Sequence, residues 1–549
     1  MKIATIKASV SKNRYFILFL VLVAFQLISN SYVIYKDKFP LIHESGTYYD
    51  FSIRYYRLFR ENYFIRIYNT EIDNKGPLFF LTSLPFYYVL GLSEDSAAMT
   101  NMIYLIIGLY ASYLIGKEIT KTAKGGFFCA FFISFMPQFF SWSRTYYLEF
   151  SIMSMLLVSF YFMIKTEFFS DRKYSIAFAL SVAAGGLIKP YFIILLSLPL
   201  LFCIIKSFGS KKKERSRKIT NIALFFAIAI ILPLAFYIAR ISYYFENVAD
   251  LLLTGASLNK ESFYLDALSY LKFFWRFSLI NFVYQFFILA LVVVFAFSFY
   301  VKKSAVRNKK TFIIFLSFIS CYLFFSFFFT VKHPHYTTTF APSIGLLIGL
   351  GFFQMSKNKL LNYFAWVCIG IAVLSFVAIS FPCEKKPFLF RQPDSDLIFE
   401  KDVYGVLFPT TQDWKIADTM LFINRSIIDQ NRVYDILLIE NMGFFHNYYP
   451  VSNLLNLPFK IFLPIACPEG SFSASCDFDY RRQINDAEFV IKMDDSRPFY
   501  KSLNAISNSE ERYEELKLEF LSSAKDFELI GVFDIPYDMG TKIYKRRGI

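Results

Sequence analysis

The chain has 549 residues and a formal net charge of +15, and 56% of its residues are hydrophobic while 18% are charged. Soluble domains average about 45–50% apolar and about 25% charged residues, so the composition excludes disordered, collagen-like and disulfide-scaffold proteins and argues against a water-soluble enzyme. Residues 1–382 carry a net charge of +21, whereas residues 383–549 carry −6. We therefore expect a basic transmembrane domain over 1–382 and a separate module over 383–549.

Apolar runs long enough to cross a bilayer recur along the first part. A run of about 18 or more apolar residues with few charges predicts a transmembrane helix. Such runs lie at roughly 14–35, 100–116, 125–142, 147–164, 174–188, 190–205, 219–243, 276–300, 311–331, 337–355 and 360–382. The sequence therefore predicts a polytopic α-helical membrane protein with about eleven transmembrane helices.

Basic loops predict the orientation of these helices, because Lys and Arg concentrate in cytoplasmic loops. The basic segments are the N-terminal residues 2–14 and the loops at 117–124, 165–173, 206–218, 302–310 and 357–359. With eleven spans, all of them are cytoplasmic, and no nucleic-acid partner is needed to explain them. If a twelfth apolar stretch, 77–93, also crossed the membrane, every later basic loop would lie outside the cytoplasm. We expect this stretch to be a re-entrant or interfacial helix in a long first outer loop, 36–99.

Residues 383–549 alternate short β-like runs with helical patterns. The β-like runs are 433–440, 488–493, 527–533 and 540–545, and the helical patterns are 414–428 and 510–521. This alternation predicts a small soluble α/β domain. The predicted orientation places this domain on the extracytoplasmic side of the inner or plasma membrane. Because that side is oxidising, Cys467 and Cys476 are candidates for a disulfide. The alternative is two free thiols.

Ionisable residues gather at the outer ends of the predicted spans. They are His43, Glu44, Lys75, Arg144, Glu149, Lys189, Lys332, His333 and His335. Such groups are costly near lipid and usually face a functional interior, although long side chains can instead reach water. Carboxylates suit acid–base chemistry, and cations at the lipid boundary suit a lipid phosphate. The sequence has no Gly-rich ATP-binding loop, so an enzyme on this face would need an already activated donor.

Five motifs in this order resemble the GT-C superfamily of polytopic glycosyltransferases, above all aminoarabinose transferases that modify lipid A and protein O-mannosyltransferases. The motifs are Glu44-Ser45-Gly46-Thr47-Tyr48, Asn74-Lys75-Gly76-Pro77-Leu78, Arg144 with Glu149, Gly186-Leu187-Ile188-Lys189-Pro190, and Lys332-His333-Pro334-His335-Tyr336. The resemblance covers roughly residues 15–380. The chain departs from the family at both expected Asp positions, which are Glu44 and Glu149, and Ser45 replaces the acidic residue that follows the first.

The resemblance implies transfer of a sugar from a polyprenyl-phosphate donor to a lipid, glycan or protein acceptor, with inversion. Glu44 would be the base, and Lys75 with Arg144 or Lys189 would neutralise the phosphate. Further roles are expected at Glu149, which would position Arg144 or the acceptor, at Tyr48, His335 and Tyr336 in donor binding, and at His43, Asp50 and His333 as secondary candidates.

We expect no cofactor or obligatory metal, because the lipid-phosphate sugar is a substrate and two His without a nearby Cys or carboxylate are weak evidence for a metal site. A transporter or flippase for a lipid-linked glycan is the rival interpretation, and a catalytically silent scaffold is the third. Against a transporter, the ionisable residues lie at one face rather than at the midplane, and the sequence has no inverted repeat.

Overall fold

The computed structural model describes residues 2–37, 44–61, 75–209, 211–238, 309–327, 338–355, 359–380, 416–426, 434–439, 459–462, 484–494, 518–535 and 539–547. The predicted span at 276–300 and the candidate disulfide of Cys467 and Cys476 lie outside these residues.

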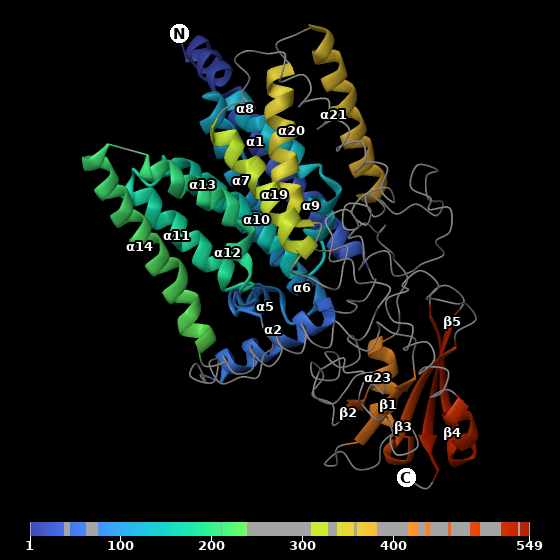
Figure 1. The fold of residues 1–549 in the computed structure, drawn as a ribbon. Coiled ribbons are helices and arrows are strands. Elements are labelled where there is room, and N and C mark those ends of the chain that lie inside the picture. Colours follow the sequence, from blue (N-terminus) through green and yellow to red (C-terminus); the bar gives the residue numbers. More distant parts are fainter. Residues whose placement is uncertain are drawn as a thin grey trace.

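Long apolar helices form most of the described chain (Figure 1). They are α1 (Lys2–Lys36), α7 (Asn101–Thr120), α8 (Ala123–Ser134), α10 (Leu148–Lys165), α11 (Arg172–Gly186), α13 (Ser197–Phe208), α14 (Lys212–Tyr237), α19 (Lys309–Phe327), α20 (Ala341–Met355) and α21 (Lys359–Ser380). Within the described residues, four helical stretches are long and apolar enough to cross a membrane, namely 13–36, 94–120, 148–165 and 212–237. The protein is a polytopic integral membrane protein.

Two predicted spans are interrupted, which corrects the interpretation of 125–142 and 190–205 as single helices. The first is α8 followed by α9 (Pro137–Trp142), and the second is α12 (Phe192–Leu195) followed by α13. Pro137 follows an extended Met136 and opens α9, because proline disfavours helical geometry in the residue before it. Pro199 lies in the first turn of α13, where it has no N–H to donate to the carbonyl four residues back.

The predicted first outer loop is itself helical. It contains α2 (Glu44–Arg60), α4 (Leu78–Leu81), α5 (Leu84–Leu90) and α6 (Glu94–Met99), which leads directly into α7. The stretch 77–93 is therefore two short helices rather than one, with Pro85 in the first turn of α5. The C-terminal tip of α5 leaves Tyr88, Val89 and Leu90 exposed, as expected of an apolar segment that meets lipid.

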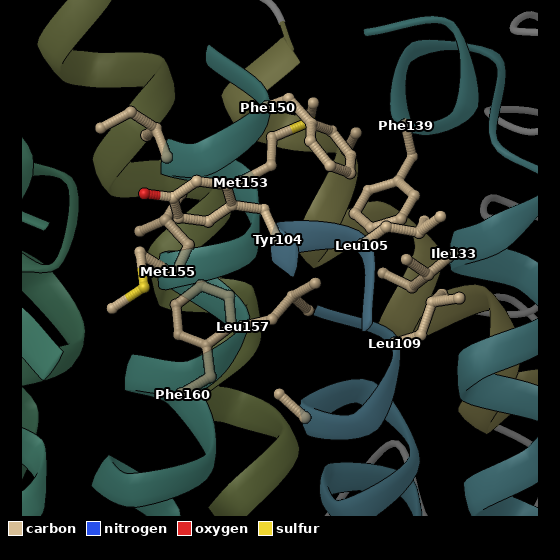
Figure 2. Close-up of a cluster of buried hydrophobic side chains, with 14 of the residues drawn as sticks. Tyr104, Leu105, Leu109, Ile133, Phe139, Phe150, Met153, Met155, Leu157 and Phe160 are labelled. Atoms are coloured by element: carbon tan, nitrogen blue, oxygen red, sulfur yellow. The ribbon is translucent and has the colours of Figure 1, made fainter. Parts of the chain in front are cut away.

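The helical core centres on α7 and α10. Figure 2 shows Tyr104, Leu105 and Leu109 of α7 together with Phe150 and other side chains of α10. Small residues bring the neighbouring helices closer than larger side chains permit. A Cβ atom on Gly116 of α7 would lie 2.5 Å from the carbonyl oxygen of Gly125 in α8. Gly116 and Gly125 therefore allow α7 and α8 to pack closely against each other.

The described residues after 383 contain a five-stranded sheet of order β2-β1-β3-β5-β4. The strands are β1 (Tyr434–Ile439), β2 (Phe459–Phe462), β3 (Phe489–Asp494), β4 (Phe527–Ile535) and β5 (Met539–Arg546). β1 is parallel to β2 and β3, whereas β5 is antiparallel to β3 and β4. The four predicted β-like runs are confirmed as β1, β3, β4 and β5, and helix α23 (Ile416–Arg425) lies within the predicted 414–428.

Candidate active site

Two predicted motif segments are joined through their backbones. The amide of Gly76 donates to the carbonyl of Ile188 at 3.1 Å, and the amide of Leu78 donates to that of Leu187 at 3.1 Å. A Cβ atom on Gly76 would lie 1.9 Å from the carbonyl oxygen of Leu187, so only glycine permits this approach. The pairing places Lys75 and Lys189 at neighbouring positions although they lie far apart in the sequence.

The segment that carries Lys189 follows the C-terminus of α11. The amide of Lys189 donates to the carbonyl of Gly185 at 3.0 Å, and the hydroxyl of Tyr237 in α14 donates to the carbonyl of Gly186 at 2.8 Å. A helix C-terminus carries partial negative charge, which favours a nearby cation. Local structure therefore helps to hold the charged Lys189 at this site.

Lys189 forms a buried ion pair with Glu149, the second residue of α10. The Lys189 side chain is 7% exposed and that of Glu149 is 0% exposed. Lys189 was not predicted as the partner of Glu149, which was expected to position Arg144 or the acceptor, and the Gly186–Pro190 turn brings Lys189 to this carboxylate. A role of Glu149 in positioning the acceptor stays a prediction. Removing one member of a buried pair leaves an uncompensated charge, so each residue constrains the other.

Lys75 lies over an aromatic stack. Its Nζ atom is 5.0 Å from the centroid of the Tyr48 ring, a distance suited to a cation–π contact. The Tyr48 ring is 5.3 Å from that of Tyr147, which is 4.6 Å from the Trp142 ring. These rings are buried and connect α2 to α9 and to the turn before α10. Tyr48 and Lys75, predicted from separate motifs, are thus in direct contact.

Arg144 lies in the same α9–α10 turn but binds elsewhere. Its Nε donates to Oδ1 of Asn30 in α1 at 2.6 Å, and its Nη2 donates to Oγ of Ser380 in α21 at 2.7 Å. The guanidinium also lies 5.0 Å from the Phe140 ring centroid and 4.9 Å from that of Phe376. These contacts tie the C-terminal ends of α1 and α21 to the turn, and they join Arg144 to neither lysine of the site.

The remaining predicted residues are only partly described. Glu44 is the first residue of α2, and the structure describes its backbone alone. Asp50 forms an ion pair with Arg54 one turn further along α2, at 2.7 Å. The predicted residues His43, His333, His335 and Tyr336 lie outside the described part of the chain. Within the described ranges, no cluster of three or more His, Cys, Asp or Glu residues could hold a metal ion.

Several contacting residues were not predicted. Tyr147 and Trp142 complete the aromatic stack, Asn30 and Ser380 bind Arg144, and Tyr237 supports the Lys189 turn. Tyr147 lies within the motif from Arg144 to Glu149 and Trp142 lies two residues before it, so their position in or beside the motif was the available signal. Asn30, Ser380 and Tyr237 lie in apolar helices far along the chain from their partners, and nothing in their local sequence distinguishes them.

Comparisons with known proteins match the segment that carries most of the candidate site. Residues 74–237 match the family model described as dolichyl-phosphate-mannose-protein mannosyltransferase. This stretch contains Lys75, Arg144, Glu149 and Lys189. A comparison with curated protein sequences finds no match. The sequence resemblance to the GT-C superfamily is confirmed by this family model together with the fold.

Two crystal structures of ArnT from Cupriavidus metallidurans have a similar fold. The apo structure has a TM-score of 0.56 and 13% identity, and the match covers 96% of this chain and 97% of that chain. The structure bound to undecaprenyl phosphate has a TM-score of 0.56 and 13% identity, with coverages of 97% and 98%. The shared fold extends over nearly the whole length of both proteins.

Proposed function

We propose that the protein is a membrane glycosyltransferase that moves a sugar from a polyprenyl-phosphate donor to an acceptor on the extracytoplasmic face. The observation that carries this proposal is the backbone pairing of residues 76–78 with 187–188, which places Lys75 and Lys189 at one site. Lysines at two neighbouring backbone positions suit the binding of a lipid phosphate. The fold is that of ArnT, which has been crystallised with undecaprenyl phosphate.

The proposed membrane topology has eleven spans, with the N-terminus in the cytoplasm and the C-terminal sheet outside. This topology places the α2–α6 segment and the α9–α10 turn at the outer membrane surface. It also places Glu149, at the start of α10, outside and Lys165, at the end of α10, inside. A lipid-linked donor would then approach Lys75 and Lys189 from the outer leaflet.

Lys75 and Lys189 have different parts in donor binding. The ammonium group of Lys75 lies over the Tyr48 ring, and a lysine ammonium binds a phosphate as a point charge. Lys189 is held by Glu149 in a buried site, where an electrostatic interaction is stronger than in water. Together they stabilise the negative charge that develops on the phosphate as the bond to the sugar breaks.

Glu44 is the proposed base. It begins α2, four residues before Tyr48, and this spacing puts both positions on the same face of the helix. In the proposed mechanism, Glu44 accepts the proton of the acceptor hydroxyl or amine while that group attacks the anomeric carbon. Attack opposite to the leaving phosphate inverts this carbon. Glu149 acts through Lys189, because it is bound to that residue and holds it in place.

The similarity to ArnT and to the mannosyltransferase family model supports a lipid or a protein as acceptor, and a glycan is the third class. The test uses the full-length protein in nanodiscs with a panel of polyprenyl-phosphate sugars and cell-envelope extract as the acceptor source. Release of free polyprenyl phosphate is measured. We expect release with at least one donor, and a loss of about 100-fold or more in Glu44→Gln, within the range for removing a general base.

Glu118→Gln is the control, because Glu118 pairs with Lys121, Lys165 and Lys310 at the other end of α10 from Glu149. It should retain most of the activity. Absence of release with every donor would contradict the proposal and favour a transporter or a scaffold. Normal release by Glu44→Gln would leave the glycosyltransferase in place and remove Glu44 as its base.

A further inference from the structure

Three segments that carry the proposed site meet at a buried group of hydroxyls. The segments are α2, which carries Tyr48, the α4–α5 region that follows Lys75, and the α9–α10 turn that precedes Glu149. We define the hydroxyl network as Ser52 of α2, Ser83 and Tyr87 of the α4–α5 region, and Tyr146 of the turn.

The network links all three segments. Ser83 Oγ and Tyr146 Oη are 2.7 Å apart, and Ser52 Oγ and Tyr87 Oη are 2.5 Å apart. Ser52 Oγ donates to the carbonyl of Tyr49 within α2 at 2.7 Å. The α4–α5 region therefore joins the other two segments, because Ser83 binds the turn at Tyr146 and Tyr87 binds α2 at Ser52.

The four side chains are between 0% and 1% exposed. A buried hydroxyl that loses its partner costs free energy, and a fully connected buried network favours one arrangement of the elements that supply it. Burial raises the pKa of the Tyr146 phenol well above its usual value, so this residue remains a neutral hydrogen-bonding group under physiological conditions. The network thus fixes the relative positions of the three segments.

Ser52 also relates the network to the catalytic end of α2. Positions 44, 48 and 52 are four residues apart and follow one face of the helix. Fixing Ser52 therefore fixes the rotation and the axial position of the face that includes Tyr48 and begins with Glu44. Tyr147, next to Tyr146, contacts the Tyr48 ring at 5.3 Å. The turn is thus held to α2 at two adjacent residues.

We propose that Ser52, Ser83, Tyr87 and Tyr146 are positioning residues for glycosyl transfer. They hold the start of α2 in register with the donor that Lys75 and Lys189 bind, and so align the base and the acceptor with the anomeric carbon. The inference rests on the proposed function. Donor binding depends instead on the backbone pairing of 76–78 with 187–188, in which the network has no part. The network is thus expected to affect turnover more than donor affinity.

The test compares Tyr146→Phe, Ser83→Ala and Ser83→Thr in the full-length protein, using the donor identified by the release assay. Tyr146→Phe and Ser83→Ala should lower kcat by about 10- to 100-fold, as expected when reacting groups are misplaced without being removed. The Kd of undecaprenyl phosphate should stay within about twofold, a difference well below 1 kcal/mol. Ser83→Thr keeps a hydroxyl and should recover much of the lost kcat.

Ser159→Ala is the matched control. Ser159 is a buried serine of α10 whose Oγ is 3.0 Å from that of Ser181 in α11, away from the three segments. It should show a similar change in thermal stability to Ser83→Ala but a normal kcat. An unchanged kcat in both Tyr146→Phe and Ser83→Ala would overturn the inference, as would a parallel loss of donor affinity. Absence of turnover in the wild-type protein would instead refute the proposed function itself.

Discussion

The two ends of helix α10 hold lysine–glutamate pairs of different kinds. At its start, Glu149 pairs with Lys189, and both side chains are buried. At its end, Lys165 shares Glu118 with Lys121 and Lys310, at 3.4, 2.5 and 2.7 Å. Lys121 is 70% exposed, and the other two lysines are 26% and 22% exposed. One end has a buried pair, and the other has a partly exposed cluster around Glu118, whose side chain is 16% exposed.

This difference indicates which of the two groups of ion pairs is a candidate functional site. Exposed ion pairs contribute about 0–1 kcal/mol to stability, and a basic cluster at the predicted cytoplasmic end fits the orientation of the helices. A buried pair gains little stability over apolar residues of the same size, so stability alone does not account for Glu149 and Lys189. A requirement for a charged group at that position accounts for both.

The largest expected effect is a difference in stability between variants at the two ends of α10. Lys189→Met leaves Glu149 buried without its ammonium partner and should destabilise the protein by about 3–5 kcal/mol. Glu118→Gln, the matched change at the other end, should cost about 1 kcal/mol or less. Thermal unfolding in detergent, followed by fluorescence, measures both. The Glu149→Gln, Lys189→Met double variant should recover part of the lost stability. Equal unfolding temperatures for Lys189→Met and Glu118→Gln would contradict the comparison.

A smaller effect is expected at the backbone pairing that joins the two motif segments. In Gly76→Ala, the new Cβ would lie 1.9 Å from the Leu187 carbonyl oxygen, so the segments must separate, at a cost of about 1–3 kcal/mol. Gly370→Ala in α21 is the control, because a Cβ there meets no atom within 4 Å. Gly76→Ala should weaken binding of undecaprenyl phosphate, and Gly370→Ala should leave it unchanged. Normal binding by both variants would show that the pairing does not position the lysines.

The sequence predicted the helices and strands better than it predicted the breaks within the apolar runs. Apolar length identified α10, α11 and α14, and the β-like runs identified four strands of the sheet. The breaks after α8 and α12 were missed because apolarity continues through Phe135–Met136 and Leu196, although Pro137 and Pro199 were visible. β2 was missed because a four-residue strand gives too short a pattern to recognise.

For the site, the sequence predicted the participants but not their pairing. Lys75, Tyr48, Glu149 and Lys189 were all candidates, and the structure brings them together in two contacts. Lys189 was missed as the partner of Glu149, because Arg144 is nearer in the sequence. Lys189 is 40 residues away from Glu149, and only the packing of α11 beside α10 brings it close. Arg144 and Ser380 are 236 residues apart in the sequence, so no local sequence pattern indicates their contact.

The central claim is that Lys75 and Lys189 form one site for a lipid phosphate. The most direct measurement is binding of undecaprenyl phosphate to the wild-type protein, Lys75→Ala and Lys206→Ala in nanodiscs. Lys206 is the matched control, because its Nζ lies 5.6 Å from the Phe202 ring in the same kind of cation–π contact, at the predicted cytoplasmic end of α13. We predict that Lys75→Ala weakens binding by about tenfold or more, which corresponds to about 1.4 kcal/mol, while Lys206→Ala binds as the wild type does. Equal affinities for all three proteins would contradict the account.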